Sequence, residues 1–197
     1  YMIKGGLWDG YNYYQLYKEA YTPWEWQKAL KEKCEEVGVD FLSTPFDPTA
    51  VDFLEGLGVE FYKIASFELV DIPLIEYVAG KGKPIVMSCG MGSVEEIEEA
   101  LDACRRQKNE NIVLLKCCSQ YPAKFEDMNI SVIPDMQKRF GKPVGLSDHS
   151  FGSLAPVVAV SLGAKVIEKH VCLNREIESA DVGFSMTMEE FAKMVQD

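Results

Sequence analysis

Two histidines, His149 and His170, are the residues with the clearest chemical potential, and each follows a short apolar run. One helix-like segment separates the two runs, so we expect neighbouring parallel strands that bring the imidazoles to one edge of a sheet. The side-chain period of a strand puts Ser147 on the face of His149, and puts Glu168 and Cys172 on the face of His170. Two imidazoles beside a carboxylate favour a divalent transition metal. The alternative for a single strand-end histidine is a hydrogen-bonded pocket residue, and Cys172 is expected to be a small core residue.

A lysine inside an apolar run is the second chemical signal. Lys63 lies within Phe61–Ser66, which has the length of a strand. A buried ammonium is costly unless it meets an anion, so phosphate or carboxylate is its natural partner. Schiff-base formation is the rival role, and the residues alone leave both open. Ser66, Ser88 and Ser147, each near the end of an apolar run, would add hydroxyl donors around the same anion.

Two carboxylates follow the predicted strands and are candidates for contact with a polar substrate. Glu68 comes just after the Lys63 strand, and Asp181 lies in the loop after the last strand. Either carboxylate could orient a sugar hydroxyl, and Glu68 could also act as a general acid or base. The competing interpretation for both is an ordinary solvated loop carboxylate.

The elements that must position these residues recur along the chain as strand-length apolar runs, each followed by a polar turn and a helical pattern. Six such units predict a parallel α/β sheet with crossover helices. The predicted strands are Asp40–Phe46, Phe61–Ser66, Pro84–Cys89, Ile112–Cys118, Pro143–His149 and Lys165–Leu173. Helices are predicted from about Pro23, from Asp47 with Pro48 at the first helical position, and from Ser93, which forms a capping box with Glu96. The first 26 residues show no sustained period and predict an irregular ordered segment.

Polar or small residues end every predicted strand, among them Thr44, Ser119 and Gln120. In parallel α/β folds, and above all in eight-stranded barrels, ligands bind at these carboxyl ends. Helix capping is the competing explanation for each position taken alone. Periodicity does not separate an eight-stranded barrel from an open doubly wound sheet. No glycine-rich dinucleotide motif or P-loop follows a strand, which disfavours nucleotide binding.

Composition restricts the partners and the compartment. The net charge is −11, without long basic runs, which argues against nucleic acid and anionic membrane as partners. The sequence contains no C-x-x-C pair, a pattern typical of reduced thiols in the cytoplasm. No apolar stretch reaches the roughly 18 residues of a membrane span, and the N-terminus lacks the pattern of a signal peptide.

Seven ordered motifs resemble the sialic acid synthase family. They are Phe41–Asp47, Tyr62–Ser66, Gly82–Ile85, Ser88–Met91, Ser119–Ala123, Gly145–His149 and Gly163–His170. The match runs over nearly the whole chain from about Thr22. The resemblance implies a (β/α)8 TIM barrel, of which this chain would hold roughly strands 3 to 8. It implies that residues 1–197 form a partial catalytic domain, without the first two strands and without the small antifreeze-like C-terminal (SAF) domain.

The resemblance also implies an activity. Members condense phosphoenolpyruvate with an open-chain acylamino-sugar and water to give a nonulosonic acid and phosphate, with a bound divalent metal, commonly manganese or magnesium. By carry-over, phosphoenolpyruvate would be held by Lys63, Thr44, Ser66, Ser88, Gln120 and Ser147. The metal would be bound by His149 and His170, and the sugar would be faced by Glu68, Tyr121 and Asp181. Lys63, Glu68 and the two histidines would be the catalytic residues, and Lys63 would then clamp an anion rather than form a Schiff base.

Within the family, Leu16–Trp26 and Ala65–Glu68 resemble the pseudaminic acid synthase branch, which implies a 2,4-diacetamido-2,4,6-trideoxyhexose as the sugar instead of N-acetylmannosamine. This sequence departs from the family pattern at two positions, with Gln120 where many members have Asn or Ser and Cys89 where Thr is usual. The family implies a homodimer for the full-length protein, and we expect this segment alone to be poorly active. The alternatives are a deoxy-sugar-acid phosphate synthase, which would need more basic residues, and a non-catalytic sugar-binding barrel.

Overall fold

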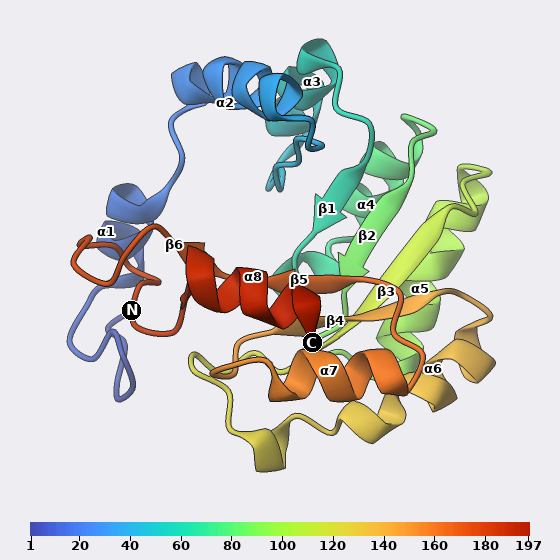
Figure 1. The fold of residues 1–197 in the computed structure, drawn as a ribbon. Coiled ribbons are helices and arrows are strands. Elements are labelled where there is room, and N and C mark those ends of the chain that lie inside the picture. Colours follow the sequence, from blue (N-terminus) through green and yellow to red (C-terminus); the bar gives the residue numbers. More distant parts are fainter.

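A curved parallel sheet of five strands forms the centre of the molecule (Figure 1). The computed structural model describes residues 1–197. The strands follow one another in sequence order across the sheet, and they are β1 Tyr62–Ile64, β2 Ile85–Ser88, β3 Ile112–Cys117, β4 Val144–Asp148 and β5 Ile167–Lys169. Neighbouring strands that are also sequential, joined by crossover helices, are the signature of part of a (β/α) barrel.

Helices connect the strands and cover one face of the sheet. The connecting helices are α4 Ile72–Ala79, α5 Val94–Arg106, α6 Ile133–Phe140 and α7 Leu154–Ser161, with short 3-10 turns η1 Ser66–Val70, η2 Phe125–Asp127 and η3 Ile130–Val132. Helix α3 Pro48–Leu57 precedes β1 and packs beside α4. Helices α1 Tyr13–Ala20 and α2 Trp24–Val37 precede the sheet, and α8 Met188–Gln196 follows it. A small parallel pair, β6 Val171–Cys172 and β7 Met186–Thr187, brackets the loop between them. None of the helices combines the length and apolar character needed to cross a membrane.

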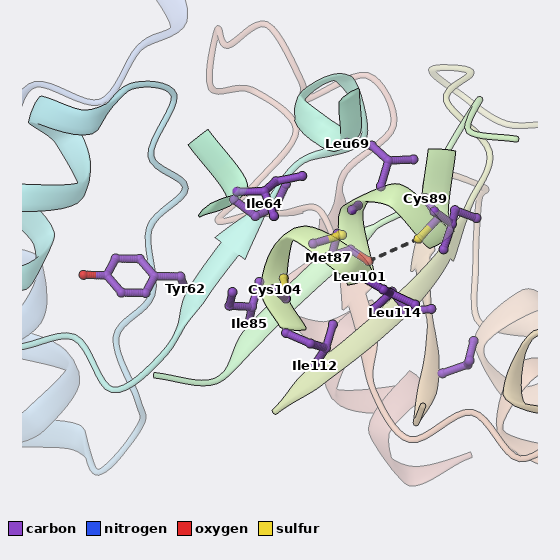
Figure 2. Packing of buried hydrophobic residues seen from close by; sticks show 14 of the residues in the cluster. Tyr62, Ile64, Leu69, Ile85, Met87, Cys89, Leu101, Cys104, Ile112 and Leu114 are labelled. Atoms are coloured by element: carbon purple, nitrogen blue, oxygen red, sulfur yellow. Dashed lines mark hydrogen bonds between the residues drawn. The ribbon is translucent and has the colours of Figure 1, made fainter. Parts of the chain in front are cut away.

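The hydrophobic core lies between the sheet and these helices (Figure 2). Alternate residues of each strand point into it, and they pack against apolar residues of α4 and α5. The strand residues in this layer include Tyr62, Ile64, Ile85, Met87, Ile112, Leu114, Val144 and Leu146. Because these positions face the helices, their neighbours along each strand must face the opposite side of the sheet.

Local sequence signals explain where the helices begin. Ser93 and Glu96 form the predicted capping box at the start of α5. The Asp47 side chain accepts hydrogen bonds from the backbone of Thr49 and Ala50 at the start of α3, with Pro48 in the first turn. Both predicted helix starts are confirmed.

Two predictions about elements are wrong. Asp40–Phe46 is not a strand, because none of its backbone groups hydrogen bonds to β1, and a strand is stabilised through such a ladder. The first 26 residues are not irregular throughout, because Tyr13–Ala20 forms α1, capped by the Asn12 side chain. The last predicted strand, Lys165–Leu173, is split at His170 into β5 and β6.

Candidate active site

The face of the sheet opposite the helices carries a polar cluster around Lys63. The Lys63 side chain is 5% exposed, and its Nζ donates to Ser88 Oγ at 2.8 Å and to the carbonyl oxygen of Ile64 at 2.8 Å. Glu168 Oε2 lies 3.6 Å from the same Nζ, and Glu168 Oε1 accepts a hydrogen bond from Ser147 Oγ at 2.6 Å. Strands β1, β2, β4 and β5 therefore each contribute one side chain to a single buried polar centre.

Two opposing effects act on the charged form of Lys63 in this centre. Burial lowers the pKa of its ammonium, and the nearby Glu168 carboxylate opposes that effect. A group of this kind gains from an additional anion, because an anion offsets the loss of hydration. The geometry fits an anion clamp, and the hydroxyls of Ser88 and Ser147 stand beside it as further donors.

A second group of small polar side chains lies at the ends of β2 and β3. Gly90 N–H donates to Ser66 Oγ at 3.0 Å, and Cys117 Sγ lies 3.8 Å from Ser119 Oγ. A Cβ atom at Gly90 would lie 2.3 Å from Ser119 Oγ and 2.8 Å from Ser66 Oγ. Only glycine therefore fits where the two hydroxyls converge.

The two histidines meet as predicted. Their ring centroids are 5.2 Å apart, and both rings lie just beyond the last residues of β4 and β5. His149 Nδ1 lies 2.9 Å from the carbonyl oxygen of Cys118, so this nitrogen carries the proton. His170 Nδ1 lies 3.3 Å from Asp181 Oδ2. With both Nδ1 atoms engaged, both Nε2 atoms are left to act as ligands. Metal-binding histidines usually donate their other ring N–H to a carbonyl oxygen or a carboxylate, as both do here.

The donor set suits a divalent cation, although this chain supplies only part of it. No group of three or more His, Cys, Asp or Glu side chains is arranged to hold a metal. Two imidazoles are therefore the contribution of these residues, and a manganese or magnesium ion would complete its shell with oxygen ligands from substrate, water or other residues. In the metal-free protein, burial acts to lower the pKa of His149, but hydrogen bonding to Cys117 and to the Cys118 carbonyl raises it.

Aromatic side chains enclose the histidine pair. The Tyr121 ring lies 4.3 Å from His149 and 6.3 Å from His170, and the Phe184 ring lies 4.8 Å from His170. The ring of Trp8, from the N-terminal segment, lies 5.6 Å from that of Tyr121 in a tilted arrangement, and its indole N–H donates to the carbonyl oxygen of Ala180 at 2.8 Å. Burial raises the pKa of Tyr121 to about 12, so its hydroxyl stays protonated and can donate a hydrogen bond.

The remaining predicted residues are less closely joined to the cluster. Glu68 Oε2 is buried without a hydrogen-bond partner, and burial raises the pKa of this carboxyl. Thr44 is half-buried, and no hydrogen bond links its side chain to the cluster. Gln120 is exposed and makes no side-chain hydrogen bond within the chain. Asp181 joins the site through its contact with His170.

Several residues of the site were not assigned from the sequence. Glu168 was placed on the face of His170, but its bridge between Lys63 and Ser147 depends on the register of β4 and β5. Gly90 and Ser119 belong to motifs that were recognised, yet only the structure shows their side-by-side approach. Trp8 lies 172 residues from its partner Ala180, and no local pattern signals such a contact.

Comparison with known proteins identifies the family. The model of the NeuB family matches residues 1–197. The chain belongs to the NeuB family. It is 44% identical over 196 residues to the pseudaminic acid synthase of Helicobacter pylori, covering 100% of this chain and 58% of that protein. It is 37% identical over 170 residues to the human N-acetylneuraminate-9-phosphate synthase, covering 86% of this chain and 47% of the human protein.

Solved structures agree with this assignment. The N-acetylneuraminic acid synthetase of Leptospira borgpetersenii, solved with citrate, superposes with a TM-score of 0.88 at 36% identity, covering 92% of this chain and 64% of that one. A heptulosonate phosphate synthase of Thermotoga maritima gives a TM-score of 0.78 at 20% identity, which supports the fold alone; 90% of this chain and 57% of that one are covered. The predicted partial TIM barrel of the sialic acid synthase type is therefore confirmed, as is the similarity to pseudaminic acid synthases. The chain spans about half the length of the curated relatives it matches.

Proposed function

We propose that the complete protein condenses phosphoenolpyruvate with an open-chain acylamino-sugar and water to give a nonulosonic acid and inorganic phosphate. The observation that carries this proposal is the buried Lys63 centre, which suits an anion, beside a histidine pair that suits a divalent cation. The similarity to pseudaminic acid synthases favours 2,4-diacetamido-2,4,6-trideoxyhexose over N-acetylmannosamine as the sugar. A sugar-phosphate acceptor is disfavoured, because Lys63 is the only basic side chain whose contacts join it to this polar centre.

Each predicted residue has a role in this reaction. Lys63, Ser66, Ser88 and Ser147 hold the phosphate and carboxylate of phosphoenolpyruvate, with Thr44 and Gln120 at its margin. A divalent ion bound by His149 and His170 would supply Lewis-acid polarisation of the sugar carbonyl oxygen. Tyr121 and Asp181 face the sugar from the side of the histidines.

Glu68 is the proposed acid or base. One oxygen of its carboxyl, Oε2, is buried without a partner, and its raised pKa brings the group nearer to the pH at which it can both accept and donate a proton. During the condensation, a bond forms between the enol carbon and the aldehyde carbon, the alkoxide oxygen takes a proton, and water adds at C2 before phosphate leaves. In this proposal, Glu68 accepts the proton that this water loses.

The relatives support inferences about the remaining domains, the oligomeric state and the compartment of the complete protein. Because the chain spans 58% of the Helicobacter protein, we infer that the complete protein contains further barrel strands and a C-terminal antifreeze-like domain. We also infer that it works as a homodimer in the cytoplasm, where phosphoenolpyruvate is available.

The test uses the full-length protein with phosphoenolpyruvate and each of the two sugars, with and without chelator, while phosphate release and the sugar acid are measured. We expect turnover with the trideoxy sugar, its loss on chelation, and a fall in kcat/KM of at least about 100-fold, or about 2.7 kcal/mol, for His149→Ala. Lys28→Ala, an exposed change on α2, is the control. Turnover that survives chelation would contradict the metal assignment, and phosphate release only with N-acetylmannosamine would contradict the choice of sugar.

A further inference from the structure

A second buried ion pair lies directly behind the two histidines, on the helix-facing side of the sheet. Lys169 Nζ lies 2.6 Å from Asp148 Oδ2, and their side chains are 1% and 0% exposed. Asp148 and Lys169 are the partners in the last paired rung between β4 and β5. His149 and His170 are the residues that follow them, so strand alternation points the ion pair and the imidazoles to opposite sides.

The ion pair also fixes the chain beyond His149. Asp148 Oδ1 accepts a hydrogen bond from Ser150 N–H at 2.8 Å, and Lys169 Nζ donates to the carbonyl oxygen of Ser150. The backbone on both sides of His149 is therefore tied to β5 through one lysine. The carbonyl oxygens of the two histidines are bound separately, by Ala123 N–H at 3.0 Å and by Met186 N–H at 2.9 Å.

A buried ion pair is a poor source of stability, because removing two charges from water costs about as much as their attraction returns. The proposed anion clamp does not use this pair, since the charges of Asp148 and Lys169 point away from Lys63 and Glu168. Its contacts are instead concentrated on the residues that flank the histidines. Such outer contacts control the direction in which a ligand side chain points.

We propose that the Asp148–Lys169 pair is a positioning device, which sets the spacing and direction of His149 and His170 and thereby the affinity of the protein for a divalent metal. This inference rests on the proposed metal site. Neither residue touches substrate. Their effect passes through the backbone, because a shift of the last rung moves both imidazoles relative to one another.

The test measures Mn²⁺ binding to the full-length protein without substrates, by the electron paramagnetic resonance signal of free Mn²⁺. Asp148→Leu/Lys169→Met replaces the pair with apolar side chains, a change that commonly preserves folding. We expect a folded protein whose Kd for Mn²⁺ is raised about 10- to 100-fold, the usual effect of losing outer contacts to a metal ligand. The control, Glu55→Gln/Lys83→Met, removes an ion pair at the other end of the sheet and should leave Kd unchanged.

A second variant keeps the test decisive if the double variant does not fold. Asp148→Asn retains the shape of the side chain and its acceptor for Ser150 N–H but weakens its hold on Lys169. We expect its Kd to rise at least about 3-fold, less than for loss of the whole pair, with thermal unfolding recorded in parallel. A wild-type Kd in the folded double variant, or in Asp148→Asn, would overturn the positioning role. Failure of the wild-type protein to bind Mn²⁺ would overturn the metal site itself, which distinguishes the two ideas.

Discussion

Lys63 shows how a single residue type can reveal a site. A lysine inside a strand-length apolar run predicted a buried ammonium that needs an anion, and the structure places it 2.8 Å from Ser88 and 3.6 Å from Glu168. The role of Ser88 was foreseen because it ends its own run. That of Glu168 was not, because its distance to Lys63 is set by sheet curvature and register, which local sequence does not encode.

Replacing Lys63 tests the anion clamp. Lys63→Met removes the charge and keeps most of the side-chain volume, so we expect KM for phosphoenolpyruvate to rise roughly 30-fold or more, about 2 kcal/mol. KM for the sugar should change little, and steady-state kinetics with each substrate varied in turn separates the two. Lys28→Met on α2 is the matched control. A larger effect on the sugar than on phosphoenolpyruvate would reassign Lys63.

The half-buried carboxyl of Glu68, whose Oε2 has no hydrogen-bond partner, predicts a pH-dependent stability. Burial raises the pKa of Glu68 above its ordinary value of 4.5 in the folded protein. The neutral carboxyl therefore favours folding, and this contribution, complete below the unfolded pKa, is lost as the pH rises through the folded pKa. Glu68→Gln avoids that loss, so its Tm relative to wild type should increase over this window.

Circular dichroism melts from about pH 4 to about pH 8 measure this difference. Glu98→Gln, on the exposed face of α5, is the control and should show no such trend. A constant difference in Tm across the window would show that Glu68 is not held neutral by the fold.

Elements were predictable where one signal dominated. The apolar runs predicted all five strands of the sheet. They therefore also predicted that His149 and His170 lie at the same edge. Asp40–Phe46 has the same composition but no hydrogen-bonded neighbour, and a strand depends on its neighbour as much as on its own residues. Helix α1 was missed because its apolar spacing, Tyr13, Leu16, Tyr17 and Ala20, lasts for only eight residues and does not make a sustained period.

The N-terminal hairpin contacts the site across a long sequence separation, and a substitution of Trp8 tests the importance of this contact. An antiparallel bridge between Met2 and Asn12 closes this hairpin. Its tip places Trp8 on Tyr121 and on the loop that carries Asp181. Trp8→Ala removes this support, so we expect KM for the sugar to rise roughly 3- to 10-fold.

Limited proteolysis provides an independent measurement, because loss of the Trp8 contact should speed cleavage within residues 173–185. Trp26→Ala on α2, which removes an exposed tryptophan away from the site, is the control. Equal KM values for the sugar in Trp8→Ala and wild type would remove the hairpin from the substrate site.

At the scale of the whole molecule, the sheet formed by this chain is open. Strands β1 and β5 end the strand order, whereas a closed barrel has no edges. We expect residues 1–197 expressed alone to self-associate and to show little turnover, because exposed strand edges pair with one another. Light scattering and the phosphate-release assay, with the full-length protein as control, measure both properties. A monomeric and fully active fragment would contradict the need for further strands.

The loop between β6 and β7 is held at its base and again around Asp181, and residues 176–179 between these points are exposed. Its base is closed by β6 and β7 and by Arg175, which donates to the Ser185 carbonyl oxygen and pairs with Glu190 at the start of α8. Residues 176–179 can therefore change in sequence or length while Asp181 keeps its contact with His170. Under the proposed function, evolution can vary this exposed stretch beside Asp181 to alter which sugar is accepted, without changing the contacts of Lys63.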